Sequence, residues 1–228
     1  MIEAKNIIKS FHNGERDQIV LNDVSLTIVD GEFLMVIGRS GAGKSTLLYQ
    51  LGLLDHPTGG TVLIDRRDTA KLSHNERTYL RLTELGYIFQ DYALVPELTA
   101  AENIMMPLLM KGNDRKIAYE KALQALVKVG IGTKAGNTPA QLSGGEQQRV
   151  SVARAIADRP KVIFADEPTA NLDSESAQKV IDLFVDLNKE GQTIVMVTHE
   201  EEYTKLADRV VTLRDGKIIS IETLQHNR

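Results

Sequence analysis

The stretch that decides the fold of this chain is Gly38-Arg39-Ser40-Gly41-Ala42-Gly43-Lys44-Ser45, which matches the phosphate-binding pattern G-x4-G-K-[ST]. Before it, the wholly apolar run Phe33–Ile37 is typical of a strand buried on both faces. After it, Leu47, Leu48 and Leu51 recur at helical spacing. The loop is therefore predicted to join a buried strand to a helix N-terminus, where partial positive charge favours an anion.

Each type of residue in this loop has its own expected role in binding a nucleotide. Its three glycines let the backbone turn tightly and bring N–H groups close to phosphate oxygens. Lys44 is expected to reach the β- and γ-phosphates, and the Ser45 hydroxyl to bind Mg²⁺. The whole predicted loop site comprises Gly38, Arg39, Ser40, Gly41, Ala42, Gly43, Lys44, Ser45 and Thr46. The alternative is a glycine-rich turn without a ligand, and for Arg39 contact with phosphate or with solvent alone both stay open.

Composition limits the class of protein. A chain of 228 residues has room for one domain, or for a domain with an inserted subdomain, and for a sizeable core. The net charge of -4 gives no global basic balance, so no nucleic-acid partner is expected. Cysteine is absent, no apolar run approaches the roughly 20 residues that span a bilayer, and residues 1–5 lack a signal-peptide core. We expect a cytoplasmic protein.

Hydrophobic periodicity predicts an α/β fold with a mostly helical insertion. The predicted elements are strands at 2–9 and 18–28, a helical stretch at 100–130, strands at 162–165 and 193–198 with an amphipathic helix between them, and a hairpin of 209–213 and 217–220. A turn is expected at Asn13-Gly14. We therefore expect one domain, with an α/β core formed by residues 1–90 and 158–228 and a helical subdomain formed by residues 91–157.

Two carboxylates directly follow the predicted strand at 162–165. Beside a phosphate-binding loop, Asp166 is expected to hold Mg²⁺ through water. Glu167 is expected to orient or deprotonate an attacking water. Two exposed acids at a strand end are common in any α/β protein, so this interpretation depends on the phosphate-binding loop upstream.

A second glycine-rich motif, Leu142-Ser143-Gly144-Gly145-Glu146-Gln147-Gln148-Arg149, begins another predicted helix. Ser143 with Glu146 three residues later forms a capping-box pattern. The glycines at 144 and 145 would in addition expose backbone N–H groups to a phosphate. The local pattern does not say whose phosphate this is.

These motifs together identify a resemblance that covers the chain from end to end. Residues 142–149 resemble the signature motif of the ATP-binding cassette (ABC) ATPases, with Ser143, Gly144, Gly145 and Glu146 as nucleotide contacts. Phe11 resembles the aromatic residue that stacks on adenine in this family, and Gln90 resembles the Q-loop glutamine that contacts Mg²⁺. The stretch Ala170-Asn171-Leu172-Asp173, with Asp173, resembles the D-loop. His199 resembles the switch histidine that contacts the γ-phosphate. Phe11 stands where tyrosine is more usual, and without the resemblance a core position would fit it equally well.

The resemblance implies a P-loop NTPase (RecA-like) core with an antiparallel β subdomain and an inserted, mostly helical subdomain. It implies that two ATPase subunits, as a homodimer or a pair, sandwich ATP and Mg²⁺ head to tail. Hydrolysis would then drive a separate integral membrane permease, with this chain peripheral on the inner face of the membrane. Residues 90–103 and 165–173 resemble the lipoprotein-releasing and macrolide- or peptide-export group, which implies export or extraction, although Ala170 replaces a common glycine there.

Other functional classes are less compatible with the sequence. An ABC ATPase of DNA repair would carry a long coiled coil between the two glycine-rich motifs, and no sustained heptads occur there. A translation-type ABC protein normally has two cassettes in one chain, and a P-loop kinase would lack the signature helix. A non-transport ABC ATPase acting on another complex stays open as the alternative.

Overall fold

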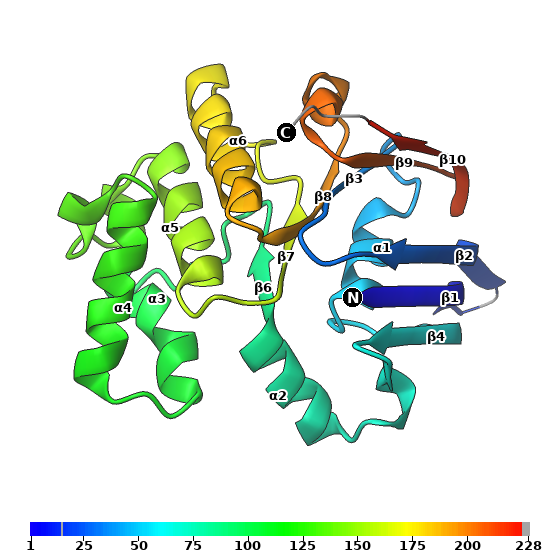
Figure 1. Cartoon of the computed structure of the whole chain (residues 1–228), viewed down its shortest axis with the longest axis horizontal. Coiled ribbons are helices and arrows are strands. Elements are labelled where there is room, and N and C mark those ends of the chain that lie inside the picture. Colours follow the sequence, from blue (N-terminus) through cyan, green and yellow to red (C-terminus); the bar gives the residue numbers. More distant parts are fainter. Residues whose placement is uncertain (15, 225–228) are drawn as a thin grey trace. The chain divides into compact units, whose positions relative to one another are not determined.

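The computed structural model describes residues 1–14 and 16–224, which fall into two compact units (Figure 1). Unit 1 comprises Met1–Tyr79 and Gly191–Arg228, and unit 2 comprises Leu80–Glu190. Both glycine-rich motifs are described, the phosphate-binding loop in unit 1 and the Ser143 motif in unit 2.

Unit 1 contains an antiparallel sheet in the order β2-β1-β4-β5. Its strands are β1 (Ile2–Asn13), β2 (Arg16–Ile28), β4 (Gly59–Ile64) and β5 (Arg67–Asp68). On β2, Val24, Leu26 and Ile28 are buried and alternate with exposed residues, as expected for a sheet with one face on the core. Asn13 pairs with Arg16, which confirms the predicted turn between the first two strands.

The buried strand before the phosphate-binding loop lies in a second, mainly parallel sheet of unit 1. β3 (Phe33–Ile37) pairs in parallel with β8 (Thr193–Thr198) on one side and with β9 (Arg209–Arg214) on the other. β10 (Lys217–Thr223) pairs with β9 as the predicted hairpin. The first four residues of β3 are at most 1% exposed, which explains why its sequence is wholly apolar.

Within its described residues, unit 1 has one complete α-helix, which follows the loop directly. This helix is α1 (Lys44–Leu51), which contacts β1 and β2 of the first sheet and β8 of the second (Figure 1). Two 3-10 helices, η1 (Thr69–Lys71) and η4 (Glu201–Leu206), lie in connecting segments. The helix α2 (His74–Glu84) begins in unit 1 and ends in unit 2.

Unit 2 combines two parallel strands with four helices. The strands are β6 (Leu85–Ile88) and β7 (Val162–Asp166), paired so that Ile88 is level with Ala165. The helices are α3 (Ala100–Met110), α4 (Arg115–Lys128), α5 (Gly144–Ile156) and α6 (Ser174–Lys189), with 3-10 helices η2 (Gly132–Lys134) and η3 (Pro139–Gln141) before α5. In Figure 1, α3, α4 and α5 lie side by side, and each contacts the other two.

The helical stretch expected at 100–130 is two helices, and the break has a local cause. Asp114 accepts a hydrogen bond from the Lys116 N–H at 2.8 Å and so caps the start of α4. The Asn113 side chain donates to the Leu108 carbonyl at 2.8 Å near the end of α3. Unit 2 also holds β6, β7 and α6, so the domain limits drawn at 90 and 158 stay a prediction.

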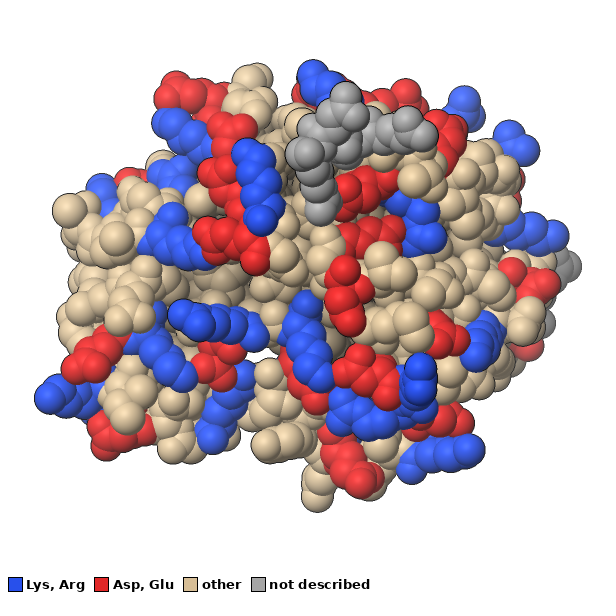
Figure 2. Space-filling model, in the orientation of Figure 1, with Lys and Arg blue, Asp and Glu red and all other residues tan. Residues whose placement is uncertain are grey.

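The surface carries charges of both signs, as expected from the small net charge. Figure 2 shows acidic and basic side chains interspersed over the face in view, without a large area of Lys and Arg alone. Within residues 1–14 and 16–224, none of the helices has the length and apolar character needed to cross a lipid bilayer.

One ion-pair cluster joins three segments of unit 2. The Asp158 carboxylate, just after α5, lies 2.5 Å from Lys111 Nζ at the end of α3 and 2.6 Å from Lys121 Nζ on α4. Burial of Asp158 opposes its ionisation, but the hydrogen bonds from Lys111 and Lys121 outweigh it, and the pKa lies below its ordinary value. The ionised carboxylate therefore stabilises the packing of these helices.

We expect Asp158→Asn to lower the free energy of unfolding at neutral pH by about 1 to 2 kcal/mol, because two partly buried ammonium groups lose their charged partner. A depressed carboxyl pKa contributes stability above its unfolded value of about 3.9, and this contribution is lost as the pH falls through the folded pKa. Denaturant unfolding at neutral and acidic pH measures both effects. The control is Glu175→Gln, which breaks the exposed Glu175–Lys179 pair and should change stability by under about 0.5 kcal/mol. Equal stability of Asp158→Asn and the parent at neutral pH would contradict this account.

Candidate functional site

The phosphate-binding loop has the geometry expected of an anion site. It leaves the end of β3 at Ile37 and turns through an Ala42 N–H to Arg39 carbonyl bond of 3.1 Å. Gly43 is the N-cap of α1, so Lys44, Ser45 and Thr46 form the first helical turn, which carries no acidic residue. The positive end of the α1 dipole therefore lies at the loop, where it favours an anion such as phosphate.

Lys44 is held inside this loop. Its side chain is buried, and Nζ donates to the Gly38 carbonyl at 2.9 Å and to the Arg39 carbonyl at 3.4 Å. A buried ammonium held by carbonyl oxygens keeps its positive charge at the loop, where phosphate oxygens are stronger acceptors. Arg39 and Ser40 are exposed, and Ala42 is buried.

Two of the loop glycines are required by neighbouring backbone. A Cβ on Gly38 (φ 154°) would come 2.2 Å from the Leu213 carbonyl oxygen of β9. A Cβ on Gly43 (φ 100°) would come 2.8 Å from the Val20 carbonyl oxygen of β2. The backbones of Leu213 and Val20 therefore leave no room for a side chain at Gly38 and Gly43. This packing requires glycine at both positions in addition to the phosphate contact predicted from the sequence.

His199 and Phe11 also belong to unit 1. Ile37 of β3 is level with Thr198 of β8, so the loop after Gly38 and the exposed His199 both follow carboxyl ends of neighbouring parallel strands. Ligands of open α/β sheets bind at this edge. Phe11, on β1, is 42% exposed, so it is not one of the core residues of unit 1.

The two acidic residues close β7 in unit 2. Asp166 is buried at the last position of the strand, and Glu167 follows it with a φ of 45°. A left-handed backbone is uncommon for a residue with a side chain and recurs at functional sites. The buried Gln148 donates to the Pro168 carbonyl at 2.8 Å and so fixes the chain directly after Glu167.

The second glycine-rich motif has the predicted capping box. Ser143 Oγ accepts from the Glu146 N–H at 3.3 Å, and Glu146 accepts from the Ser143 N–H at 2.9 Å. The bond from the Ser143 N–H to the Glu146 carboxylate, together with the nearby Lys134 ammonium, holds the pKa of Glu146 below its ordinary value. A hydroxyl can accept one bond and donate another, so Ser143 can cap α5 and still donate to a phosphate.

Packing against neighbouring side chains explains why positions 144 and 145 are glycine, which the sequence alone did not show. A Cβ on Gly145 would lie 2.6 Å from Ser176 Oγ of α6, and a Cβ on Gly144 would lie 3.0 Å from Tyr92 Oη. Ser176 in turn donates through N–H and Oγ to Asp173, each at 2.9 Å, and these bonds lower the Asp173 pKa. Asp173 is therefore the N-cap of α6, a local role that its D-loop resemblance did not reveal.

The segment after β6 is held by side-chain hydrogen bonds that were not predicted from the sequence. Tyr92 and Ala93 both have positive φ, 64° and 46°. Arg154 of α5 donates to the carbonyls of both, at 3.0 Å and 2.5 Å, and Asn171 donates to the Gln90 carbonyl at 2.9 Å. The predicted Q-loop, D-loop and signature helix are thus bonded to one another within unit 2.

The structure brings the predicted residues together in two sets. One set, in unit 1, contains the phosphate-binding loop, His199 and Phe11. The other set, in unit 2, contains Gln90, Ser143, Asp166, Glu167 and Asp173. Within the second set, the register of β6 with β7 puts Gln90 and Asp166 at the same edge of the strand pair.

Comparison with known proteins decides the family. The model of a protein family described as ABC transporter matches residues 21–170, which include the phosphate-binding loop, the Ser143 motif and both β7 acids. The chain belongs to the ABC transporter family. It is an ATP-binding cassette ATPase, and the predicted fold and family resemblance are confirmed.

The relatives extend over the whole chain. The lipoprotein-releasing system ATP-binding protein LolD of Aquifex aeolicus is 45% identical over 96% of this chain and 96% of its own length. The macrolide export ATP-binding/permease protein MacB of Burkholderia thailandensis is 43% identical over 96% of this chain, which spans 34% of that relative. A solved dimeric cassette, MJ0796 in a post-hydrolysis state with ADP and Pi, superposes with a TM-score of 0.93 at 39% identity and covers 99% of this chain and all of that one. The predicted resemblance to the lipoprotein-releasing and macrolide-export group is therefore confirmed.

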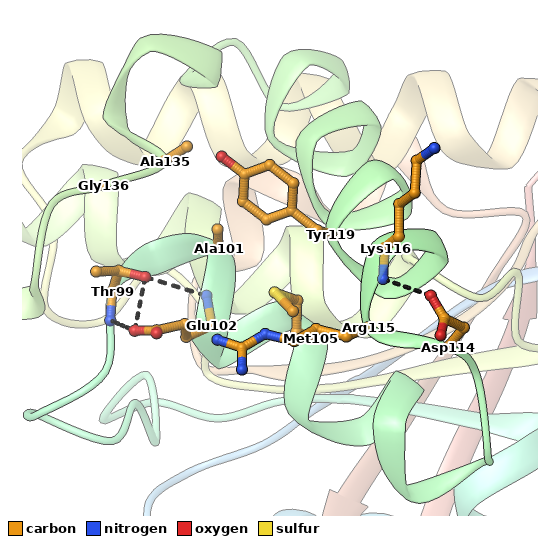
Figure 3. A pocket seen from close by; sticks show the side chains of 10 residues that line it. All are labelled: Thr99, Ala101, Glu102, Met105, Asp114, Arg115, Lys116, Tyr119, Ala135 and Gly136. Atoms are coloured by element: carbon orange, nitrogen blue, oxygen red, sulfur yellow. Dashed lines mark hydrogen bonds between the residues drawn. The ribbon is translucent and has the colours of Figure 1, made fainter.

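A cavity in the helical part of this cassette holds none of the predicted nucleotide residues. Its volume is about 590 Å³, and residues of α3, α4 and the segment after η2 line it (Figure 3). Thr99 and Glu102 at its edge form the capping box of α3, with bonds of 2.9 and 3.2 Å. Tyr119 extends from α4 toward Ala135 in the same view.

Proposed function

We propose that two copies of this cassette, or this cassette and a paired subunit, enclose ATP between the phosphate-binding loop of one chain and the Ser143 helix start of the other. The observation that carries this proposal is that one chain has two glycine-rich helix N-termini, that of α1 at Gly43 and that of α5, which has a capping box. In one the ammonium of Lys44 lies on the loop carbonyls, and in the other a serine hydroxyl can still donate. Contacts present only in the closed pair would make ATP binding favour closure and hydrolysis favour release.

Magnesium would accompany the nucleotide. Residues 1–14 and 16–224 contain no group of three or more His, Cys, Asp or Glu side chains arranged to hold a metal. The proposed donors fit Mg²⁺ nevertheless, because this ion takes oxygen ligands and is held by one or two protein groups together with phosphates and waters. Ser45 offers a hydroxyl, Asp166 a buried carboxylate and Gln90 an amide oxygen. The ion would neutralise charge on the phosphates.

The remaining polar residues would divide the chemistry of hydrolysis. Glu167, which follows β7 in a left-handed backbone conformation, would orient or deprotonate the attacking water. His199, at the strand end beside the loop, would contact the γ-phosphate. Phe11 would stack on adenine through its exposed ring. Asp173, a helix cap in the single chain, would act near the interface of the pair.

The cassette would act with a separate integral membrane permease, peripheral to the inner face of the membrane, in export or extraction of a cargo. The relatives named above support this proposal through their printed functions of lipoprotein release and macrolide export. The apolar residues near the end of α3 differ in burial: Met105 and Leu108 are buried, whereas Leu109 and Met110 are 42% and 67% exposed. Together with the segment Tyr92–Glu97, these exposed residues are the proposed permease contact.

We expect Glu97→Lys together with Met110→Glu to abolish co-purification with the permease while ATP hydrolysis by the isolated cassette stays within about twofold, because both side chains are exposed. The measurement is affinity purification of the tagged cassette from detergent-solubilised membranes, with mass spectrometry to identify a membrane-spanning subunit. A matched control is Lys179→Glu, another exposed charge change, on α6. Unchanged recovery of the same subunit with the double variant would contradict this contact. Recovery of no membrane subunit with the parent would favour the non-transport alternative.

A further inference from the structure

Lys9 lies beside the aromatic residue proposed to stack on adenine. Its Nζ is 4.9 Å from the centroid of the Phe11 ring, within the range of a cation–π contact. The two residues are two positions apart on β1, and the ladder to β2 shifts register on both sides of Lys9. Such irregularities change the direction of side chains. The exposed Phe11 ring thus has a positive charge beside it.

The ammonium of Lys9 is anchored rather than solvated. The side chain is only 12% exposed, and Nζ contacts the Asp55 carboxylate at 2.7 Å and the His56 carbonyl at 2.8 Å. A lysine on a surface strand usually extends into water, so this burial and these two partners hold its charge at one place. The position of the charge is therefore set by the segment that follows α1.

Asp55 is itself fixed by its surroundings. It accepts from Gln50 Nε2 at 3.0 Å and from the His56 N–H at 2.7 Å. Burial opposes its ionisation, but the bond from Lys9 and those from His56 and Gln50 outweigh this, and the pKa lies below its ordinary value. Gln50 belongs to α1, the helix that starts at the phosphate-binding loop. A continuous set of bonds thus leads from the phosphate-binding helix to the ring.

We propose that Lys9 is a positioning residue for adenine: its anchored ammonium fixes the Phe11 ring in the orientation that receives the base. This inference rests on the proposed nucleotide site. Phenylalanine has no hydroxyl through which a hydrogen bond could orient it, so the ring depends on packing and on the adjacent cation. Loss of Lys9 would leave the phosphate contacts of the P-loop in place. It would weaken only the contribution of the adenine base to nucleotide affinity.

The chain has no tryptophan, which provides a direct optical test. Phe11→Trp introduces a single indole at the stacking position, and its emission reports contact with a base. Binding of ADP and of inorganic pyrophosphate is then measured with Mg²⁺ for Phe11→Trp alone and combined with Lys9→Met or Lys9→Arg. The two ligands share the phosphates and differ in adenosine. ADP is used in place of ATP because the enzyme does not hydrolyse it during the titration.

The expected result is that Lys9→Met weakens ADP binding about three- to tenfold. Pyrophosphate binding should stay within about twofold, and the emission change on ADP binding should shrink. Lys9→Arg should restore most of the ADP affinity, because it keeps the cation. Asp55→Asn, which loosens the ammonium without removing it, should shift ADP binding in the same direction by less. Thermal melting of each variant sets a temperature at which all are folded.

Two results would overturn the role of Lys9 while leaving the nucleotide site intact. One is unchanged ADP affinity in Lys9→Met. The other is equal weakening of ADP and pyrophosphate, since a general loss of structure would affect both ligands. If the parent bound neither ligand, the nucleotide site itself would be wrong, and the role of Lys9 with it.

Discussion

Replacing Glu167 with Gln is expected to lower steady-state ATP hydrolysis by about 100- to 1,000-fold while MgATP still binds. Glutamine keeps the shape of the side chain and fits the same left-handed position after β7, but it cannot accept a proton from water. Because ATP is then bound but not hydrolysed, the variant should accumulate as a dimer. Phosphate release measures the rate, and light scattering after gel filtration in MgATP measures the dimer.

The control for this prediction is Glu120→Gln, the same change at an exposed residue of α4. Its hydrolysis rate should stay within about twofold of the parent, because surface substitutions away from a site have small effects. Near-normal hydrolysis by a clean preparation of Glu167→Gln would show that another group activates the water.

The second large effect is expected from Lys44→Ala, which should weaken ATP binding by about tenfold to 100-fold, the equivalent of the roughly 1.5 to 3 kcal/mol of a hydrogen bond to a charged group. The reason is geometric: Lys44 Nζ lies 2.9 Å from the Gly38 carbonyl, inside the loop that would surround the phosphates. Calorimetric titration with ADP or a slowly hydrolysed ATP analogue measures the loss.

Lys44→Ala removes the ammonium from the Gly38 and Arg39 carbonyls, and circular dichroism checks that the variant remains folded. Lys44→Arg is the informative comparison, because it keeps the charge in a larger group that the buried position accommodates poorly. Unchanged nucleotide affinity in Lys44→Ala would contradict the placement of the phosphates at this loop.

Features set by neighbouring residues were predictable from the sequence. The apolar run of β3 and the capping box of Ser143 with Glu146 are both visible within a few positions of the sequence. The hairpin at 214–217 has the same local origin. These elements have strong signals because hydrophobic periodicity and turn chemistry act over short distances.

Contacts between distant residues were not predictable from a single sequence. Arg154 clamps carbonyls 61 and 62 positions away, and Gly145 is small because Ser176 of α6 approaches it. Lys9 meets Asp55, which is 46 positions away. Short elements were missed for another reason. β6 has only four residues and depends on its pairing with β7. The helix α2 does have a local signal, the reciprocal bonds of Ser73 with Glu76 at its start, but its sequence is largely polar and the helix was not predicted.

The central claim is that the Ser143 motif acts on the ATP of a second chain. One protein carries Lys44→Ala, another carries Ser143→Arg, and both carry Glu167→Gln so that ATP is retained. Each homodimer then has two defective sites. In a mixed pair, the intact Ser143 motif of the first chain faces the intact phosphate-binding loop of the second, which restores one site.

The measurement is occlusion of radiolabelled ATP after differently tagged chains are mixed and heterodimers are isolated through both tags. Because Ser143→Arg also removes a helix cap, Ser143→Gly serves as a milder second variant that tests folding. The shared site predicts that ATP is occluded only in the mixed pair, at about one nucleotide per dimer. Heterodimers that are isolated intact and occlude no ATP would contradict it.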